Sequence, residues 1–252
     1  MSRARILPAI IAGSGLYEPA GWKATGADTV STPWGEPSEP IKRGVFKDTE
    51  VLFLPRHGRD HRLPPHRINY RANIAALAAC GATHVLAFNV VGGINPALPA
   101  GRLLVPDQII DYTWGRGHTF SDAANQKLQH VDFTWPYDAA LRETLLSTGK
   151  RQDVDIHNGG VYGATQGPRL ESAAEIARLE HDGCDIVGMT GMPEAGLARE
   201  QGLPYACLAL VVNPAAGKSE APIGLSDIER VLSEKLPLVN ALLLDCCRQI
   251  GA

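Results

Sequence analysis

The sequence has little of what marks nucleic-acid-binding, membrane or disulfide-rich proteins. Its formal net charge is −3, so nothing indicates a general attraction to nucleic acid or to an anionic membrane surface. Its five cysteines form an odd set without metal-ligand spacing, which favours reduced thiols and a cytoplasmic location. The apolar run near the N-terminus is only about six residues long, too short for a signal peptide or a membrane span. An anionic substrate would therefore need a local cluster of cations.

What is present is the composition of an ordinary globular protein, 44% hydrophobic and 20% charged over 252 residues. Continuous apolar runs alternate with helical segments, as expected for strands covered on both faces. This pattern predicts a single α/β domain over residues 1–252, with a mixed, mainly parallel sheet flanked by helices. The expected strands lie within 6–15, 51–58, 84–93, 103–112, 185–195 and 203–213, and the expected helices within 68–81, 135–149, 172–183, 192–202 and 225–251. The irregular stretch 112–136 is long enough to suggest a functional loop.

Residues directly after each expected strand are the candidates for a binding site, because ligands of open α/β sheets bind beyond the carboxyl ends of strands. "GSGL" at 13–16 offers backbone N–H groups and the Ser14 hydroxyl to an oxyanion, although it could equally be a plain turn. Arg56 and His57 follow a later strand, and more cations come close behind: Arg59, His61, Arg62, His66 and Arg67. A solvated loop is the alternative, but this local cation density favours a phosphate site.

Other strand ends carry different chemistry. The pair Gly92–Gly93 ends an apolar strand and is either a turn or a place where a flat ligand lies against bare backbone. Met189 and Thr190 offer an apolar surface and a hydroxyl, although a buried methionine is often plain core. Asn213 ends a strongly apolar strand, where a buried amide needs hydrogen-bonding partners and a ligand is one way to supply them.

Together these segments resemble the trimeric purine nucleoside phosphorylase and methylthioadenosine phosphorylase family. The resemblance is carried, in the family's order, by "GSGL", "PRHGRDHRLPPHRINYRANIAAL", "NVVGGI", "DQIIDYT", "TQGPRLESAAE", "DIVGMTGMPEA" and "VVNPAAG". It spans nearly the whole chain and implies one α/β domain with a distorted central sheet. It also implies a homotrimer whose active sites take residues from the neighbouring subunit.

The resemblance assigns roles residue by residue. Phosphate would be held by Ser14, Arg56, His57, Asn89, Val90 and Thr190, and this sequence departs from many relatives in having Asn89 and Val90 where they have threonine and alanine. The nucleoside would contact Val91, Gly92, Leu170, Glu171, Met189, Asn213, Pro214 and Ala215. His57 would fix the attacking phosphate and Asn213 would stabilise the departing base. His130, in the long loop, would reach into the neighbouring subunit's 5′ pocket.

Two features narrow the expected substrate. Asn213 and Glu171 stand where relatives that use methylthioadenosine carry an aspartate and a serine, which favours a 6-oxopurine over adenine. An apolar 5′ pocket is expected where relatives that prefer an unmodified ribose have a histidine, formed by Ile223, Leu225, Ile228 and Val231. The expected reaction is phosphorolysis of S-methyl-5′-thioinosine, with inorganic phosphate as co-substrate and no metal or other cofactor. Methylthioadenosine or general 6-oxopurine nucleoside phosphorolysis is the alternative.

Three other functions fit parts of the sequence. "RHG" after a strand is also the signature of histidine phosphatases, but these carry it in the opening strand and need a second histidine late in the chain, whereas the last of the eight histidines here is His181. A non-catalytic nucleoside-binding protein would not release free base. A hydrolytic nucleosidase would release base without phosphate, and the cations around Arg56 and His57 speak against it.

Overall fold

The computed structural model describes residues 5–122, 128–220 and 223–252. Its strands are β1 (Pro8–Ala12), β2 (Lys23–Asp28), β3 (Ile41–Phe46), β4 (Thr49–Pro55), β5 (His84–Gly93), β6 (Leu103–Val105), β7 (Gln108–Asp111), β8 (Ile156–Asn158), β9 (Val161–Ala164), β10 (Ile186–Gly188) and β11 (Tyr205–Pro214). Its α-helices are α1 (Tyr70–Ala79), α2 (Ala139–Arg151), α3 (Ala173–His181), α4 (Glu194–Glu200) and α5 (Leu225–Gly251). Short 3-10 turns lie at Arg59–His61 and Pro65–Arg67.

The sheet is mixed and is organised around the long strand β5. The strands pair in the order β2-β3-β4-β1-β5-β10-β9-β7, while β11 pairs with β5 and β6, and β6 pairs with β8. β5 runs parallel to β1 and β11, but its last residues, Gly92 and Gly93, pair with β10 in the antiparallel sense. The branching at this point makes the sheet irregular, and it brings β10 against the end of β5.

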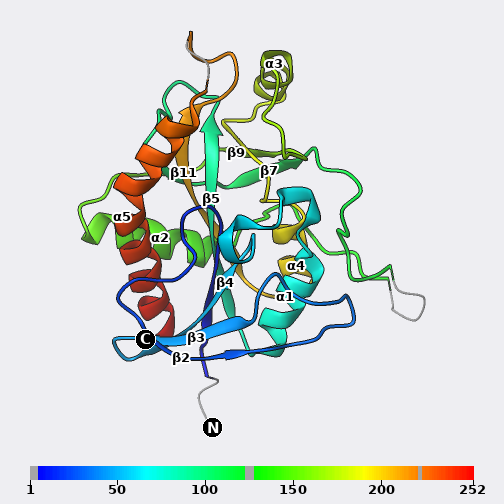
Figure 1. The fold of residues 1–252 in the computed structure, drawn as a ribbon, viewed down its shortest axis with the longest axis vertical. Coiled ribbons are helices and arrows are strands. Elements are labelled where there is room, and N and C mark those ends of the chain that lie inside the picture. The colour runs from blue at the N-terminus through cyan, green and yellow to red at the C-terminus, as the bar shows by residue number, and fades with distance from the viewer. Residues whose placement is uncertain (1–4, 123–127, 221–222) are drawn as a thin grey trace.

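Side chains of β5 and β11 alternate between two hydrophobic cores. Ala87 and Cys207 belong to the core that contains residues of α1 and α4, whereas Phe88 and Leu208 belong to the core that contains residues of α2 and α5. Figure 1 shows these two pairs of helices on opposite sides of the two strands. The fold therefore has a helix layer on each face of the sheet, which is why the strands read as continuous apolar runs.

The predicted α/β fold with a mixed central sheet flanked by helices is confirmed. Each predicted helical segment contains a helix, and each predicted apolar run contains one or two strands. The sequence pattern missed β2 and β3, where β2 is almost wholly exposed and β3 carries Lys42 and Arg43, so no apolar run marks them. It also missed β8 and β9, which are only 3 and 4 residues long. In the described part of the chain, no helix has the length and hydrophobicity needed to cross a membrane.

The topology places several strand ends at one edge of the sheet. β1, β4, β5 and β11 run parallel within one set of neighbours, so their carboxyl ends meet there. β10 runs the other way against β5, and the residues that follow it therefore continue alongside Asn89 and Val90. Segments from all five strands can thus contact one ligand.

Candidate active site

A cavity of about 450 Å³ lies where these strand ends meet. Its walls include most of the residues that the sequence singled out, namely Ser14, Arg56, His57, Val90, Val91, Gly92, Leu170, Glu171, Met189, Thr190, Asn213, Ala215, Ile223, Leu225 and Ile228. The structure thus brings residues more than 200 positions apart in the chain to one cavity, of a size suited to a small organic ligand.

Four of the residues singled out by the sequence do not line this cavity. Pro214 is exposed as the last residue of β11, and its carbonyl accepts a hydrogen bond from the Asn213 amide at 2.6 Å. Val231 is 5% exposed and packs into the core beneath α5, one helical turn beyond Ile228. His130 is exposed on the long loop. Asn89 is buried, on the face of β5 that carries Ala87, and its side chain does not line the cavity.

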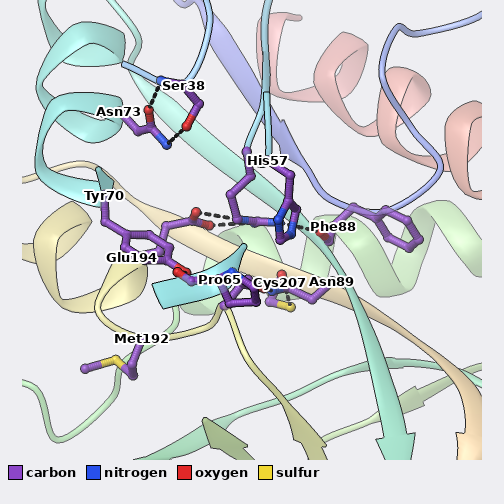
Figure 2. Close-up of polar contacts among 12 residues, drawn as sticks. Ser38, His57, Pro65, Tyr70, Asn73, Phe88, Asn89, Met192, Glu194 and Cys207 are labelled. Carbon is purple, nitrogen blue, oxygen red and sulfur yellow. Dashed lines mark hydrogen bonds and ion pairs between the residues drawn. The ribbon is translucent and has the colours of Figure 1, made fainter. Parts of the chain in front are cut away.

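Arg56 enters the cavity wall as half of a buried ion pair. It lies directly after β4, is fully buried, and donates from Nε and Nη2 to the two carboxylate oxygens of Glu194 on α4, at 2.6 and 2.7 Å (Figure 2). Its Nη1 donates to the Phe88 carbonyl at 3.0 Å, and Tyr205 donates its hydroxyl to the same carboxylate at 2.9 Å. Burial alone would lower the pKa of Arg56, but the Glu194 carboxylate outweighs it and raises that pKa.

This pairing leaves the guanidinium two free donors. Three of its five N–H groups are used in contacts with the described residues, which leaves one on Nη1 and one on Nη2. Nη1 lies against Gly13, where an added Cβ would come within 3.1 Å of it. A glycine at the start of the "GSGL" turn therefore lets Arg56 lie close to the backbone beside Ser14.

His57 is a neutral imidazole in this site. Burial, together with the nearby His61 and Arg56, lowers its pKa to about 3, although the hydrogen bond to the Leu63 carbonyl acts in the opposite direction. Its Nδ1 lies 2.8 Å from the Leu63 carbonyl, which can only accept, so the ring proton is on Nδ1. Nε2 is therefore a hydrogen-bond acceptor, able to accept a hydrogen bond from a hydroxyl group of a ligand.

The predicted cluster of cations reaches the cavity only in part. Of the cations behind His57, His61 lines the cavity, stacked on the His57 ring with centroids 3.9 Å apart. Burial lowers the pKa of His61 as well. Arg62 instead pairs with Glu39 at 3.1 Å. Neutral donors, the remaining N–H groups of Arg56 and backbone amides are thus the features available to an anion.

The two glycines at the end of β5, Gly92 and Gly93, are required for different reasons. Gly92 lines the cavity, and an added Cβ would lie 3.2 Å from the Val187 side chain and close to Ala215. At Gly93 an added Cβ would lie 2.5 Å from the Leu98 carbonyl oxygen, so this glycine is required by backbone packing. Open backbone facing a ligand is therefore an explanation for Gly92 alone.

The other end of the cavity is more open. Glu171 is half-buried and accepts a hydrogen bond from the Thr165 hydroxyl at 2.5 Å, which leaves its second carboxylate oxygen available. Leu170 beside it is 45% exposed, and Leu225 at the start of α5 is 74% exposed. The helix start has no side-chain cap at Gly224. Few contacts within one chain hold this end.

Arg116 is a site residue that the sequence patterns did not reveal. It lies in the long loop between β7 and α2 and is 8% exposed. Its guanidinium donates to the Met189 and Met192 carbonyls at 2.9 and 2.6 Å, and to the Gln166 carbonyl at 2.8 Å. It thereby joins the segment that leads to Glu171 to the segment that carries Thr190. A lone arginine in an irregular loop gives no sequence signal of this role, and the same holds for Glu194.

Comparison with known proteins agrees with this geometry. Residues 9–248 match the family described as Phosphorylase superfamily. The chain is 53% identical to a probable S-methyl-5′-thioinosine phosphorylase of Pseudomonas syringae pv. tomato, over 93% of this chain and 96% of the relative. It is 43% identical to the 6-oxopurine nucleoside phosphorylase of Pyrococcus furiosus, over 94% of this chain and 90% of the relative.

A solved structure supports the same assignment. The fold superposes with a TM-score of 0.94 on methylthioadenosine phosphorylase from Schistosoma mansoni in complex with adenine, at 32% identity over 98% of this chain and 92% of the other. The family resemblance seen in the sequence motifs, and the expectation of an enzyme of the nucleoside phosphorylase type, are therefore confirmed. The chain belongs to the phosphorylase superfamily.

Proposed function

We propose that the protein catalyses phosphorolysis of S-methyl-5′-thioinosine, giving hypoxanthine and 5-methylthioribose 1-phosphate. The observation that carries this proposal is that one cavity is lined both by Asn213 and Glu171 and by Ser14, Arg56, His57 and Thr190. The relatives named probable S-methyl-5′-thioinosine phosphorylase, at 53% and 54% identity, support the same substrate.

In this reaction the C1′–N9 bond breaks and a phosphate oxygen forms the new bond to C1′. Positive charge grows on the ribose and negative charge on the base as the bond lengthens, so both must be stabilised together. Phosphate held by Ser14, Thr190 and the free N–H groups of Arg56 supplies both the nucleophile and the anion facing the sugar. Neutral His57 accepts a hydrogen bond from a phosphate hydroxyl at Nε2. We expect no metal or organic cofactor, with inorganic phosphate as co-substrate.

The purine edge selects the base. Asn213 uses one amide N–H on the Pro214 carbonyl and keeps a donor and an acceptor, which suit the 6-oxo oxygen and a proton on N7. Glu171 has a carboxylate oxygen free to accept the N1–H that hypoxanthine has and neutral adenine lacks. An aspartate in place of Asn213 would set its oxygen against the 6-oxo oxygen. Discrimination against methylthioadenosine should be at least about a hundredfold.

Paired assays test this substrate. With phosphate present, one assay follows hypoxanthine released from methylthioinosine and the other follows adenine released from methylthioadenosine, for wild type and Asn213→Asp. Wild type should favour the 6-oxo compound, and Asn213→Asp should lose most of that activity. Faster adenine release by the wild type would refute the substrate, and base release without phosphate would refute phosphorolysis.

A general 6-oxopurine nucleoside phosphorylase is the second candidate, because relatives of that name match at 42% and 43% identity. The 5′ end of the cavity distinguishes the two. Ile223, Leu225 and Ile228 line it and offer apolar contact to a methylthio group. Methylthioinosine should therefore be preferred over inosine by about one to two orders of magnitude in kcat/KM. Equal efficiency on both would favour the second candidate.

We also propose that the protein works as a homotrimer in the cytoplasm. Apolar residues on the long loop are exposed in one chain, with Leu128 at 64% and Trp135 at 66%, and they flank His130. A second copy packed there would cover them and could bring His130 to the 5′ end of its neighbour's cavity. The cysteines are free thiols, as expected in a reducing compartment. Full activity in a monomer, by sedimentation and assay, would contradict the trimer.

A further inference from the structure

Asn89 is a polar side chain that the proposed reaction does not yet use. It is 1% exposed and does not line the cavity, although Val90, Val91 and Gly92 directly after it do. It lies on the face of β5 that carries Ala87, and Cys207 of the neighbouring strand β11 lies on the same face. Its side chain is not among those that line the cavity, and its amide instead contacts neighbouring side chains.

The Asn89 amide connects two other side chains. Its Nδ2 donates to the Thr190 hydroxyl oxygen at 2.7 Å, and its Oδ1 accepts from the Cys207 thiol at 3.2 Å (Figure 2). Cys207 is fully buried, and burial raises the pKa of its thiol, so it keeps its proton and acts as donor. This fixes the amide with its oxygen toward Cys207 and its NH₂ toward Thr190.

The direction of these bonds determines what Thr190 can do. Thr190 is 7% exposed and lines the cavity with Ser14, Arg56 and His57. Because its oxygen accepts from Asn89, the hydroxyl proton remains for another acceptor. In the reverse arrangement the Thr190 hydroxyl would donate its proton to the Asn89 amide oxygen, and only oxygen lone pairs of Thr190 would face the cavity. A phosphate dianion needs donors, so only the first arrangement favours it.

We propose that Asn89 and Cys207 form a hydrogen-bonded chain that orients the Thr190 hydroxyl proton toward bound phosphate. Asn89 is then a positioning residue, acting through Thr190 without touching the anion. The proposal rests on the proposed phosphorylase function and assigns a supporting shell to its phosphate site. It also accounts for an asparagine at this position, since its amide spans the two partners that a shorter hydroxyl side chain could not join in the same way.

A double-mutant cycle tests the proposed hydrogen-bonded chain. Phosphate KM and methylthioinosine KM are measured for wild type, Asn89→Leu, Thr190→Val and the double variant, with thermal unfolding as a check on folding. Each single change should raise phosphate KM about 10- to 100-fold with nucleoside KM nearly unchanged. The double variant should be no worse than Thr190→Val alone, because Asn89 acts only through that hydroxyl. Additive effects would overturn the proposal, since they would mean that Asn89 meets phosphate directly.

Variants of Cys207 give a second, independent test of the hydrogen-bonded chain, which remains possible if Asn89→Leu does not fold. Cys207→Ser keeps an O–H donor and should retain wild-type phosphate KM, whereas Cys207→Ala should raise phosphate KM several-fold. Equal phosphate KM in Cys207→Ala and wild type would remove Cys207 from the chain and contradict the proposal.

Tyr162 serves as the matched control. Its buried hydroxyl forms no hydrogen bond of normal geometry with the described residues, but the Thr190 backbone and hydroxyl lie close enough to act on it as hydrogen-bond donors and to lower its pKa against the effect of burial. It is therefore the competing acceptor for the Thr190 proton. Tyr162→Phe should leave phosphate KM unchanged. A rise as large as that of Thr190→Val would show that Tyr162, and not Asn89, orients the hydroxyl. If the wild type released no base with phosphate present, the phosphorylase function itself would be refuted. If the wild type released base with phosphate but Asn89→Leu had an unchanged phosphate KM, only the hydrogen-bonded chain from Cys207 to Thr190 would be refuted.

Discussion

The two ends of the cavity are built in different ways. At the phosphate end, Arg56, His57 and Thr190 are each less than 10% exposed, and each is fixed by at least one hydrogen bond. At the nucleoside end, Leu170 and Leu225 are 45% and 74% exposed. The difference shows that burial and hydrogen bonds fix the end proposed to bind phosphate, whereas the end proposed to bind the nucleoside leaves apolar side chains exposed in one chain.

Substitutions at the two ends of the cavity should have different effects on stability and on ligand binding. Changes at the phosphate end disturb buried groups whose partners are then left unsatisfied, so they should affect both stability and phosphate binding. Changes at the nucleoside end remove partly exposed apolar contacts, so they should affect substrate preference with little effect on folding. Each of the following changes tests one side of this contrast.

The largest effect is expected from Arg56→Ala. It leaves the Glu194 carboxylate buried without its partner, which should lower the free energy of unfolding by about 3–5 kcal/mol. It also removes two free donors at the anion, so phosphate KM should rise by at least about tenfold. Urea denaturation and initial-rate kinetics measure the two effects.

A double variant separates these two consequences. Arg56→Leu/Glu194→Leu removes both charges and should recover most of the lost stability, because a buried pair can be replaced by packed apolar side chains. It should not recover phosphate binding. If the double variant recovered both stability and phosphate binding, Arg56 would contribute to folding and not to phosphate binding. The two ends of the cavity would then differ less in how they bind ligands than the structure indicates.

Arg116→Met tests whether the two ends are joined. It keeps a long side chain but leaves the carbonyls of Gln166, Met189 and Met192 without their donor. The segments carrying Glu171 and Thr190 should then lose their fixed spacing, and kcat/KM should fall about 10- to 100-fold. Arg71→Met is the control, because Arg71 pairs with Asp122 on the same loop and does not line the cavity. Equal losses in both variants would indicate a general effect on the loop.

Acid sensitivity should be concentrated at His57. The unfolded chain binds a proton here below pH 6.5, whereas the folded chain does so only near pH 3. Stability is therefore unaffected by this group above pH 6.5 and falls as the pH is lowered through this window, by about 1.4 kcal/mol per pH unit. Between pH 7 and pH 5, the free energy of unfolding measured by urea denaturation should fall further for wild type than for His57→Asn, by about 2 kcal/mol. Parallel losses in the two proteins would contradict a buried neutral imidazole.

The smallest effect is expected from Ile228→Ala. Removing part of an apolar wall from the 5′ end should reduce the preference for methylthioinosine over inosine by about three- to tenfold, corresponding to roughly 1 kcal/mol of lost contact. Thermal stability should change little, because Ile228 is only partly buried. Val231→Ala is the matched comparison, since Val231 belongs to the core and should affect stability and leave the preference unchanged. A loss of stability in Ile228→Ala together with a changed substrate preference in Val231→Ala would contradict this assignment of the two residues.

Much of the fold and the contents of the cavity could be predicted from the sequence alone. Continuous apolar runs mark β1, β4, β5 and β11 because helices cover both faces of these strands, and the residues after a strand end are found by position along the chain. Ser14, Arg56, Thr190 and Asn213 were identified in this way. Polar or very short strands such as β2 and β8 leave no such pattern, because their pairing depends on neighbours and not on their own burial.

Only the tertiary structure decided how the site residues are charged and oriented. Glu194 lies 138 residues from Arg56, and their pairing balances the charge of the one arginine among the described residues that lines the cavity. Burial makes His57 uncharged, and the register of β5 against β11 places Cys207 where it can orient the Asn89 amide. Local spacing determines which residues follow a strand, but hydrogen-bond partners and desolvation depend on segments that meet only after the chain has folded.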